Sequence, residues 1–286
     1  MEWLNHYINY IKENKKLSQN TINSYEADIK DYIIYFENKD INPLDVCEGD
    51  ILAYSRYLEE NQKSISTISR KISSIRSFYD FLFYNKIIKK NPSSNIKKPV
   101  VSKKENDILS ESEIDSLLKF KNLDTPKLIR DKAIFELLYG TGMKVTELAV
   151  LKVTDIDLEF DFIRCGQKHR IIPLREKTKK YLQLYIMDSR EKFANKNQKY
   201  LFVNTQGNQF SRQGIWKIIK SYASNLRTQK SINPSMLRHS FAIHLLNKGA
   251  KASSVGKILG NNNVASLQSY VENKKQKKQK ELDKKN

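Results

Sequence analysis

Residues 233–238 have the types and spacing of a helix start that binds anions. Asn233 is a favoured helix cap and Pro234 suits the first helical position, so a helix is expected to begin here. Ser235 and Arg238 then lie three residues apart on one face of its opening turns. A helix N-terminus attracts anions, and Arg offers phosphate a planar, permanently charged fork. The segment therefore predicts a phosphate-binding site.

The cysteines and histidines indicate neither metal nor redox chemistry. Cys47 and Cys165 form no Cys-x-x-Cys motif and fit no disulfide framework, and the four histidines are scattered along the chain. We therefore expect no metal site and no cofactor.

The charge balance indicates a polyanionic partner. The 286-residue chain has 51 Lys and Arg against 32 Asp and Glu, a net charge of +19, and such a field attracts nucleic acid or an anionic membrane. No apolar run approaches the ~20 residues of a membrane-spanning helix. The N-terminus does not have the pattern of a secretory signal. We expect a cytoplasmic protein that binds nucleic acid and no membrane.

The strongest concentration of charge is internal. Residues 61–104 hold 11 basic residues and a single acid, Asp80. One interpretation is a solvated linker. The interpretation that we favour is a phosphate-contacting helix followed by a connector along a duplex, because three of the basic residues lie within an apolar-periodic helix. The predicted DNA contacts are Arg70, Lys71, Arg76, Lys97, Lys98, Lys103 and Lys104. The Lys-rich tail, residues 273–286, is expected to be disordered.

Residues 1–91 predict a helical domain of four helices. Each has apolar residues at helical spacing: about residues 1–14, a second helix after Ser18, residues 51–61, and a fourth from near Ser66 to before Pro92. Residues 92–107 contain two prolines and paired lysines without periodicity, and are expected to form a basic linker.

Residues 108–272 predict a second, mainly helical domain. Residues 110–113 form a capping box, and the Thr-Pro pair at 125–126 begins another helix. Further helices follow, one from Asn233 and a last one that carries Tyr270.

One β-hairpin is expected within this second domain. Residues 161–165 and 170–174 have strand character on either side of a short segment that contains Gly166 and Lys168. The sequence therefore predicts one small sheet with a basic tip in an otherwise helical domain.

Three segments, taken in order, resemble the tyrosine recombinase or phage integrase family, in particular its Xer-like branch. They are Tyr139–Leu148 (YGTGMKVTEL), Leu237–Leu246 (LRHSFAIHLL), and Leu259–Asn261 with Tyr270 nine residues beyond. The first domain resembles the family's SAM-like core-binding domain through Asn20-Thr21 and Arg76–Tyr79. The resemblance implies a mainly α fold with a small β-sheet, in which an N-terminal helical core-binding domain precedes a domain of the tyrosine-recombinase catalytic type.

The resemblance also implies a two-domain clamp around double-stranded DNA, active in site-specific recombination or integration. In the family, a Tyr hydroxyl attacks a phosphodiester and forms a 3′-phosphotyrosyl link without metal or ATP. Two Arg and a Lys or His set hold the phosphate and move protons. Here Tyr270 matches the nucleophile and Arg238 one of the Arg. Arg suits the negatively charged transition state, and Lys suits protonation of the leaving oxygen.

The chain departs from the family at four of these positions. Lys144 replaces the first Arg, Cys165 the hairpin Lys, Ser235 a His, and Asn261 a His or Trp. A Lys ammonium is a point charge and lacks the planar, two-pronged geometry of a guanidinium. An unperturbed thiol is neutral at pH 7, and the side chains of Ser and Asn do not act as acids near neutral pH. Lys168 is the candidate substitute acid. Lys168 and Arg170 are also predicted DNA contacts, and Glu147 is expected to support Lys144.

Our preferred hypothesis is a double-stranded-DNA-binding member of this family whose strand exchange is impaired or lost. One alternative is an active site-specific recombinase that cuts and rejoins DNA through Tyr270. Another is nicking and resealing like that of a type IB topoisomerase. The expected partners are double-stranded DNA and either further copies of the chain, up to a tetramer on DNA, or a catalytically complete recombinase.

Overall fold

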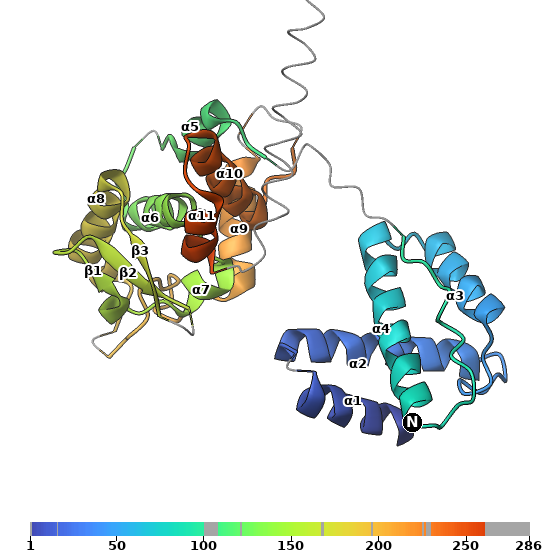
Figure 1. Cartoon of the computed structure of the whole chain (residues 1–286). Helices are drawn as coiled ribbons and strands as arrows, with labels where there is room; N and C mark the ends of the chain where they lie inside the picture. The colour runs from blue at the N-terminus through green and yellow to red at the C-terminus, as the bar shows by residue number, and fades with distance from the viewer. Residues whose placement is uncertain are drawn as a thin grey trace, which may run out of the picture. The chain divides into compact units, whose positions relative to one another are not determined.

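Helices make up most of the structure, a computed structural model that describes residues 2–15, 17–99, 108–120, 122–166, 169–195, 197–224, 226 and 230–260. The chain divides into two units, residues 1–103 and 104–286. The first unit is a set of packed helices and the second combines helices with a small sheet (Figure 1). The predicted fold class, mainly α with a small sheet, is confirmed.

Four helices build the described part of the first unit: α1 (Glu2–Asn14), α2 (Gln19–Glu37), α3 (Glu48–Glu60) and α4 (Ile65–Tyr84). The hydroxyls of Ser18 and Ser64 cap α2 and α4 by accepting backbone N–H groups of the first turn. Helix α3 begins earlier than its apolar pattern suggests, because the Asp50 carboxylate accepts the backbone N–H of Cys47 at 2.9 Å and closes a cap there.

Tyrosine side chains fill the centre of the first unit. Tyr7, Tyr32, Tyr54 and Tyr79 are buried. The hydroxyls of Tyr32 and Tyr79 lie 3.0 Å apart, and that of Tyr79 donates to the carbonyl of Pro43 at 2.8 Å. These rings contribute large apolar surfaces, while the bonds satisfy polar atoms that would be costly to bury alone.

The chain stays on the first unit after α4 ends. The Asn91 amide donates to Asp80 at 2.8 Å, and Ile96 is buried in the same core. The first residues of the expected 92–107 linker are therefore packed against this unit. Residues 100–107 lie outside the described residues.

Seven α-helices are described in the second unit: α5 (Glu111–Leu118), α6 (Pro126–Thr141), α7 (Val145–Val150), α8 (Glu176–Leu184), α9 (Arg212–Ala223), α10 (Pro234–Asn247) and α11 (Ala252–Leu259). The predicted starts of α5, α6 and α10 are confirmed, because the side chains of Ser110, Thr125 and Asn233 accept the expected backbone N–H groups. Helix α6 is the central element of this unit, with α8 and α10 packed against it (Figure 1).

The predicted hairpin is confirmed and belongs to a three-stranded antiparallel sheet. Its strands are β2 (Phe162–Cys165) and β3 (Arg170–Pro173), with Cys165 opposite Arg170. A third strand, β1 (Ile156–Asp157), pairs with the other edge of β2 and gives the order β1-β2-β3. Strand β1 was not predicted from the sequence, because two residues are too few to show a period. Helix α11 packs against β3, which brings the hairpin to the end of that helix.

Candidate phosphate-binding site

Arg238 joins the three segments through which the sequence resembles the recombinase family. It lies on α10, and its Nη1 donates to the carbonyl of Gly142 at 2.7 Å, just before α7. Its Nη2 donates to the carbonyl of Leu259 at 2.7 Å, at the end of α11. Gly142 ends α6 with a φ of 62°, a left-handed conformation that favours glycine. The guanidinium is thereby held in one orientation between segments that are far apart in the sequence.

The charge of Arg238 survives its partial burial. Burial lowers the pKa of its guanidinium, the Glu147 carboxylate opposes this shift, and the Arg170 guanidinium adds to it. An arginine nevertheless keeps its proton at any physiological pH. The site therefore contains a fixed, partly exposed cation of the kind that binds phosphate.

Glu147 and Arg170 form a two-pronged ion pair next to Arg238. The Arg170 Nη1 and Nη2 atoms donate to the two carboxylate oxygens at 2.8 and 2.7 Å, and Nε donates to the carbonyl of Ile258 at 2.8 Å. Although burial opposes ionisation of Glu147, the Arg170 guanidinium holds the pKa of this carboxyl below its ordinary value. These bonds commit the Arg170 guanidinium inside the unit, and its role as a DNA contact stays a prediction.

The predicted support of Lys144 by Glu147 needs correction. Glu147 accepts the backbone N–H of Lys144 at 2.8 Å, which caps α7, while its ion pair is with Arg170. The side chain of Lys144 is exposed. Glu147 therefore fixes the start of α7 and not the ammonium group of Lys144.

Two glycines make room for the Arg170 guanidinium. Gly166 and Gly260 have φ values of 73° and 64°. A Cβ at Gly166 would lie 2.8 Å from Nη1 of Arg170, and one at Gly260 would lie 3.1 Å from the same atom. A side chain at either position would therefore push against the ion pair as well as strain the backbone.

Cys165, at the position of the family's hairpin Lys, is a buried thiol. Only 1% of its surface is exposed. Burial, with a smaller contribution from the nearby Glu147 carboxylate, raises its pKa to about 12. The thiol therefore holds its proton tightly at neutral pH and is a poor acid for a leaving oxygen.

The remaining predicted residues of this site divide into two groups. Ser235 is exposed in the first turn of α10, on the same helix as Arg238. Five of the predicted residues lie outside the described residues: Lys103, Lys104, Lys168, Asn261 and Tyr270.

Within the described ranges, neither a membrane-crossing helix nor a metal-binding cluster is found. No helix there combines the length and apolar character needed to span a bilayer, and no three His, Cys, Asp or Glu side chains are placed to share an ion. Cys47 and Cys165 are both free thiols, the first exposed and the second buried.

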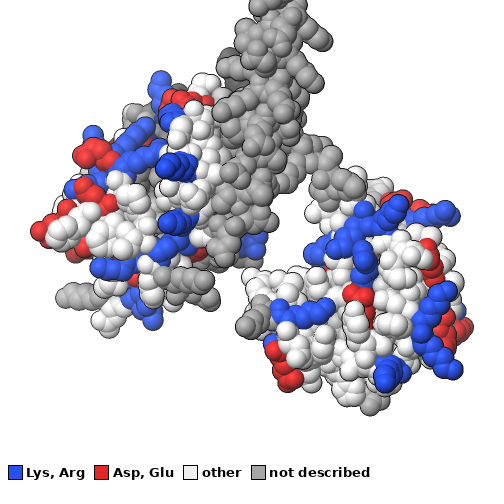
Figure 2. All heavy atoms as spheres, in the orientation of Figure 1, with Lys and Arg blue, Asp and Glu red and all other residues white. Residues whose placement is uncertain are grey.

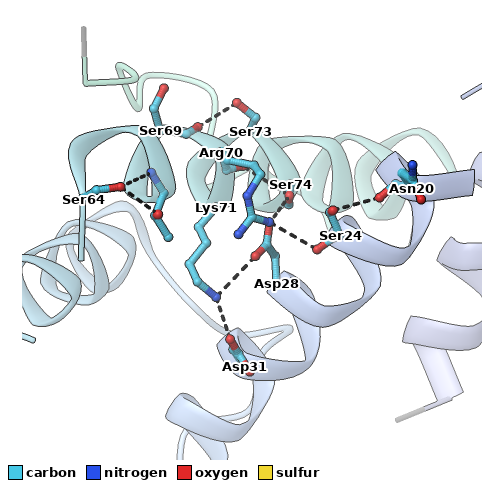
Figure 3. Close-up of polar contacts among 11 residues, drawn as sticks. Asn20, Ser24, Asp28, Asp31, Ser64, Ser69, Arg70, Lys71, Ser73 and Ser74 are labelled. Atoms are coloured by element: carbon cyan, nitrogen blue, oxygen red, sulfur yellow. Dashed lines mark hydrogen bonds and ion pairs between the residues drawn. The ribbon is translucent and has the colours of Figure 1, made fainter. Parts of the chain in front are cut away.

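Asp28 on α2 binds two of the predicted DNA-contacting residues of α4, Arg70 and Lys71 (Figure 3). Its buried carboxylate pairs with Arg70, lies 3.3 Å from the Lys71 ammonium, and accepts the Ser74 hydroxyl at 2.8 Å. Lys71 also pairs with Asp31 at 2.6 Å, and only 7% of its side chain is exposed. The charge of Lys71 is therefore used to join α2 and α4, and its contact with DNA stays a prediction.

The other basic residues of this stretch remain open to a ligand. Arg70 keeps 43% of its side chain exposed beside Asp28, and Lys97 and Lys98 are exposed. Arg76 is half-buried and donates weakly to the carbonyl of Ile96 at 3.4 Å. Basic side chains are prominent on the visible surface of both units in Figure 2, with acidic ones among them.

Helix α9 presents a basic face that was not predicted from the sequence. Its inner side chains, Ile215 and Ile219, are fully buried. Its outer side chains are exposed and polar or basic, with one indole among them: Arg212, Gln213, Trp216, Lys217 and Lys220. Their helical spacing around two isoleucines is visible in the sequence and was the available signal.

Comparison with known proteins agrees with this architecture. The phage integrase family matches residues 107–277, and its N-terminal SAM-like domain matches residues 4–86. The chain therefore belongs to the phage integrase family, the tyrosine recombinases.

Within that family, several similar proteins are Xer recombinases. Tyrosine recombinase XerD of Oceanobacillus iheyensis is 39% identical over 272 residues, which cover 93% of this chain and 91% of that protein. Tyrosine recombinase XerC of a Roseiflexus species is 34% identical over 273 residues, covering 93% and 87%. The prediction of an Xer-like tyrosine recombinase is confirmed.

Solved structures share the fold. The Tn1549 transposon integrase in complex with circular intermediate DNA has a TM-score of 0.74 at 20% identity, covering 94% of both chains. XerH recombinase bound to a difH substrate has a TM-score of 0.68 at 18% identity, covering 94% of this chain and 92% of that one.

Proposed function

We propose that the chain binds double-stranded DNA in site-specific recombination and that its own strand-exchange chemistry is impaired. The observation that carries the second part is Cys165. Where the family resemblance calls for a Lys that protonates the leaving oxygen, this chain has a buried thiol with a pKa of about 12. Loss of a general acid typically costs a factor of about 10²–10⁴ in rate.

Duplex binding is supported by the exposed cations of both units. Arg70, Lys97 and Lys98 are open in the first unit, and α9 presents Arg212, Lys217 and Lys220 in the second. Fold relatives were solved in complex with DNA, among them the XerH recombinase and the Tn1549 integrase. A helix with an exposed basic face is the kind of element that enters a major groove. We infer assembly with further copies, or with a complete recombinase, on one DNA site.

An active recombinase is the second candidate, and Arg238 favours it. Its guanidinium is held by the carbonyls of Gly142 and Leu259, so the retained phosphate ligand is already oriented. Preorganised donors of this kind contribute most of the stabilisation of a developing anion. Tyr270 would then supply the nucleophile.

A covalent-adduct assay separates the two candidates. Duplexes that bind the protein are first selected from a random pool. Each is then prepared as a series with a nick at successive nucleotide positions. When cleavage occurs close to a nick, the short fragment with the free 5′-hydroxyl dissociates, so religation is prevented and the phosphotyrosyl link accumulates. The expected result is saturated binding without adduct. An adduct that disappears in Tyr270→Phe, while binding is unchanged, would establish the active recombinase instead.

A further inference from the structure

Arg170 holds three segments of the second unit together. It lies on β3 opposite Cys165. Its terminal nitrogens bind both carboxylate oxygens of Glu147 on α7, and its Nε binds the carbonyl of Ile258 on α11. Only 16% of its side chain is exposed.

Ile258, whose carbonyl accepts from Arg170, directly precedes Leu259, whose carbonyl accepts from Arg238. Arg170 and Arg238, from different elements, thus bind consecutive carbonyls in the last turn of α11. The last carbonyls of a helix lack partners within it, and cations are favoured at that end of the helix dipole. The chain continues from there through Gly260 to Asn261.

We propose that Arg170 is a positioning residue, which is fixed by Glu147 and sets where α11 ends relative to Arg238. In this role it carries no phosphate, and its contribution to any chemistry is to fix the last turn of α11 up to Gly260. The consequence for cleavage rests on the proposed function, whereas the placement of α11 does not.

The shape of the side chain supports this assignment. Three donors of one planar group serve three acceptors on two segments, which a lysine ammonium cannot reproduce because it lacks the fixed fork. Gly166 and Gly260 approach the same guanidinium, so the space around it is fitted to Arg. The backbone of Arg170 is paired with that of Cys165 across the β2–β3 hairpin, so the sheet fixes the position from which the side chain extends.

Amide hydrogen exchange of the full-length chain tests the placement without DNA. In Arg170→Gln and in Glu147→Gln, the amides at the end of α11 should exchange about tenfold faster, since bonds to charged groups that fix this turn are lost. Helix α9 should be unaffected. Arg164→Gln is the matched control, because Arg164 is an exposed arginine of the same hairpin. Faster exchange spread over the whole unit, or none at α11, would overturn the proposal.

The salt dependence of duplex binding tests the alternative that Arg170 contacts phosphate. Loss of one phosphate contact lowers the slope of log affinity against log salt by about 0.9. We expect the slope of Arg170→Gln to equal that of the wild type, whereas that of Lys97→Gln falls. A reduced slope for Arg170→Gln would overturn the proposal.

Two further measurements keep this test separate from the proposed function. Arg170→Lys, which keeps the charge but not the fork, should show the fast exchange of Arg170→Gln. If the α11 amides of Arg170→Lys exchanged as slowly as those of the wild type, the charge of residue 170 would be sufficient, and the proposed positioning role of the guanidinium would be contradicted. If the wild-type chain failed to bind any duplex, the proposed function would fall while the exchange data still decided the role of Arg170.

Discussion

Burial decides which side chains around Arg238 can act on a phosphate. Lys144 and Ser235 are exposed, so they can reach a ligand, but neither can replace the fork of an Arg or the acidity of a His. Cys165 on β2 is buried and its pKa is raised to about 12, so this thiol does not deliver a proton readily. At this scale the described residues include an oriented cation, Arg238, that suits a phosphate, and the proposed impairment of proton transfer rests on Cys165.

The reactivity of the two thiols checks this description. At pH 8, a thiol with a pKa of about 12 is almost entirely protonated, and Cys165 is buried whereas Cys47 is exposed, so Cys165 should react far more slowly than Cys47 with a disulfide reagent. One thiol should be titrated promptly and the second only on unfolding. Cys47→Ser should abolish the fast phase and Cys165→Ala should leave it intact. A fast phase that survives Cys47→Ser would show that Cys165 is accessible and ionised.

At the scale of elements, ion pairs between helices fix how the helices are aligned along one another. Apolar stripes alone would not fix this alignment. Asp28 on α2 gathers Arg70, Lys71 and Ser74 from α4 into one cluster. A cluster of this kind is sensitive to the loss of its central carboxylate, because Lys71 would then keep its buried charge with Asp31 alone.

Asp28→Ala should therefore destabilise the first unit by about 3 kcal/mol, the lower end for a broken buried pair, since Asp31 still balances Lys71. Unfolding by urea is followed through the fluorescence of Trp3 in a Trp216→Phe background, because these are the two tryptophans of the chain. Glu26→Ala removes an exposed pair with Lys30 from the same helix and should cost less than about 1 kcal/mol. Equal losses in the two variants would refute a special role for Asp28.

Local signals in the sequence predicted the elements well, and contacts between distant segments limited the rest. The caps at Ser110, Thr125 and Asn233 and the hairpin involve neighbours in the chain, so spacing was sufficient to find them. The pairs of Lys71 with Asp31 and of Arg170 with Glu147 join residues 40 and 23 positions apart. No residue pattern along the chain encodes such a partner, so both basic residues were predicted to face DNA.

At the scale of the whole molecule, the excess positive charge is carried by side chains on both units. Lys97 and Lys98 in the first unit and the outer face of α9 in the second are exposed. When these groups neutralise DNA phosphates, the counterions of the phosphates are released. The affinity for duplex DNA therefore falls with salt concentration, more steeply when more phosphates are neutralised.

Affinity for duplex DNA should consequently fall by about 10³–10⁵ between 50 and 200 mM salt if six to ten phosphates are contacted. Lys97→Gln with Lys98→Gln, and Lys217→Gln with Lys220→Gln, should each lower the slope by about 2 in a fluorescence anisotropy titration. Lys30→Gln serves as the control, because this ammonium is paired with Glu26 at 2.7 Å. An unchanged slope in both double variants would remove these surfaces from the interface.

The burial of Ile96 bears on how the protein can be dissected. A fragment cut after residue 91, where the apolar helical pattern ends, would leave a hole in the tyrosine-filled interior and strip Arg76 of the carbonyl it contacts. A fragment that extends to residue 99 retains both. Experiments on the isolated first unit should therefore use the fragment that ends at residue 99. If the fragment that ends at residue 91 were unstable, the missing Ile96 side chain would explain it, and not an inability of the four helices to fold alone.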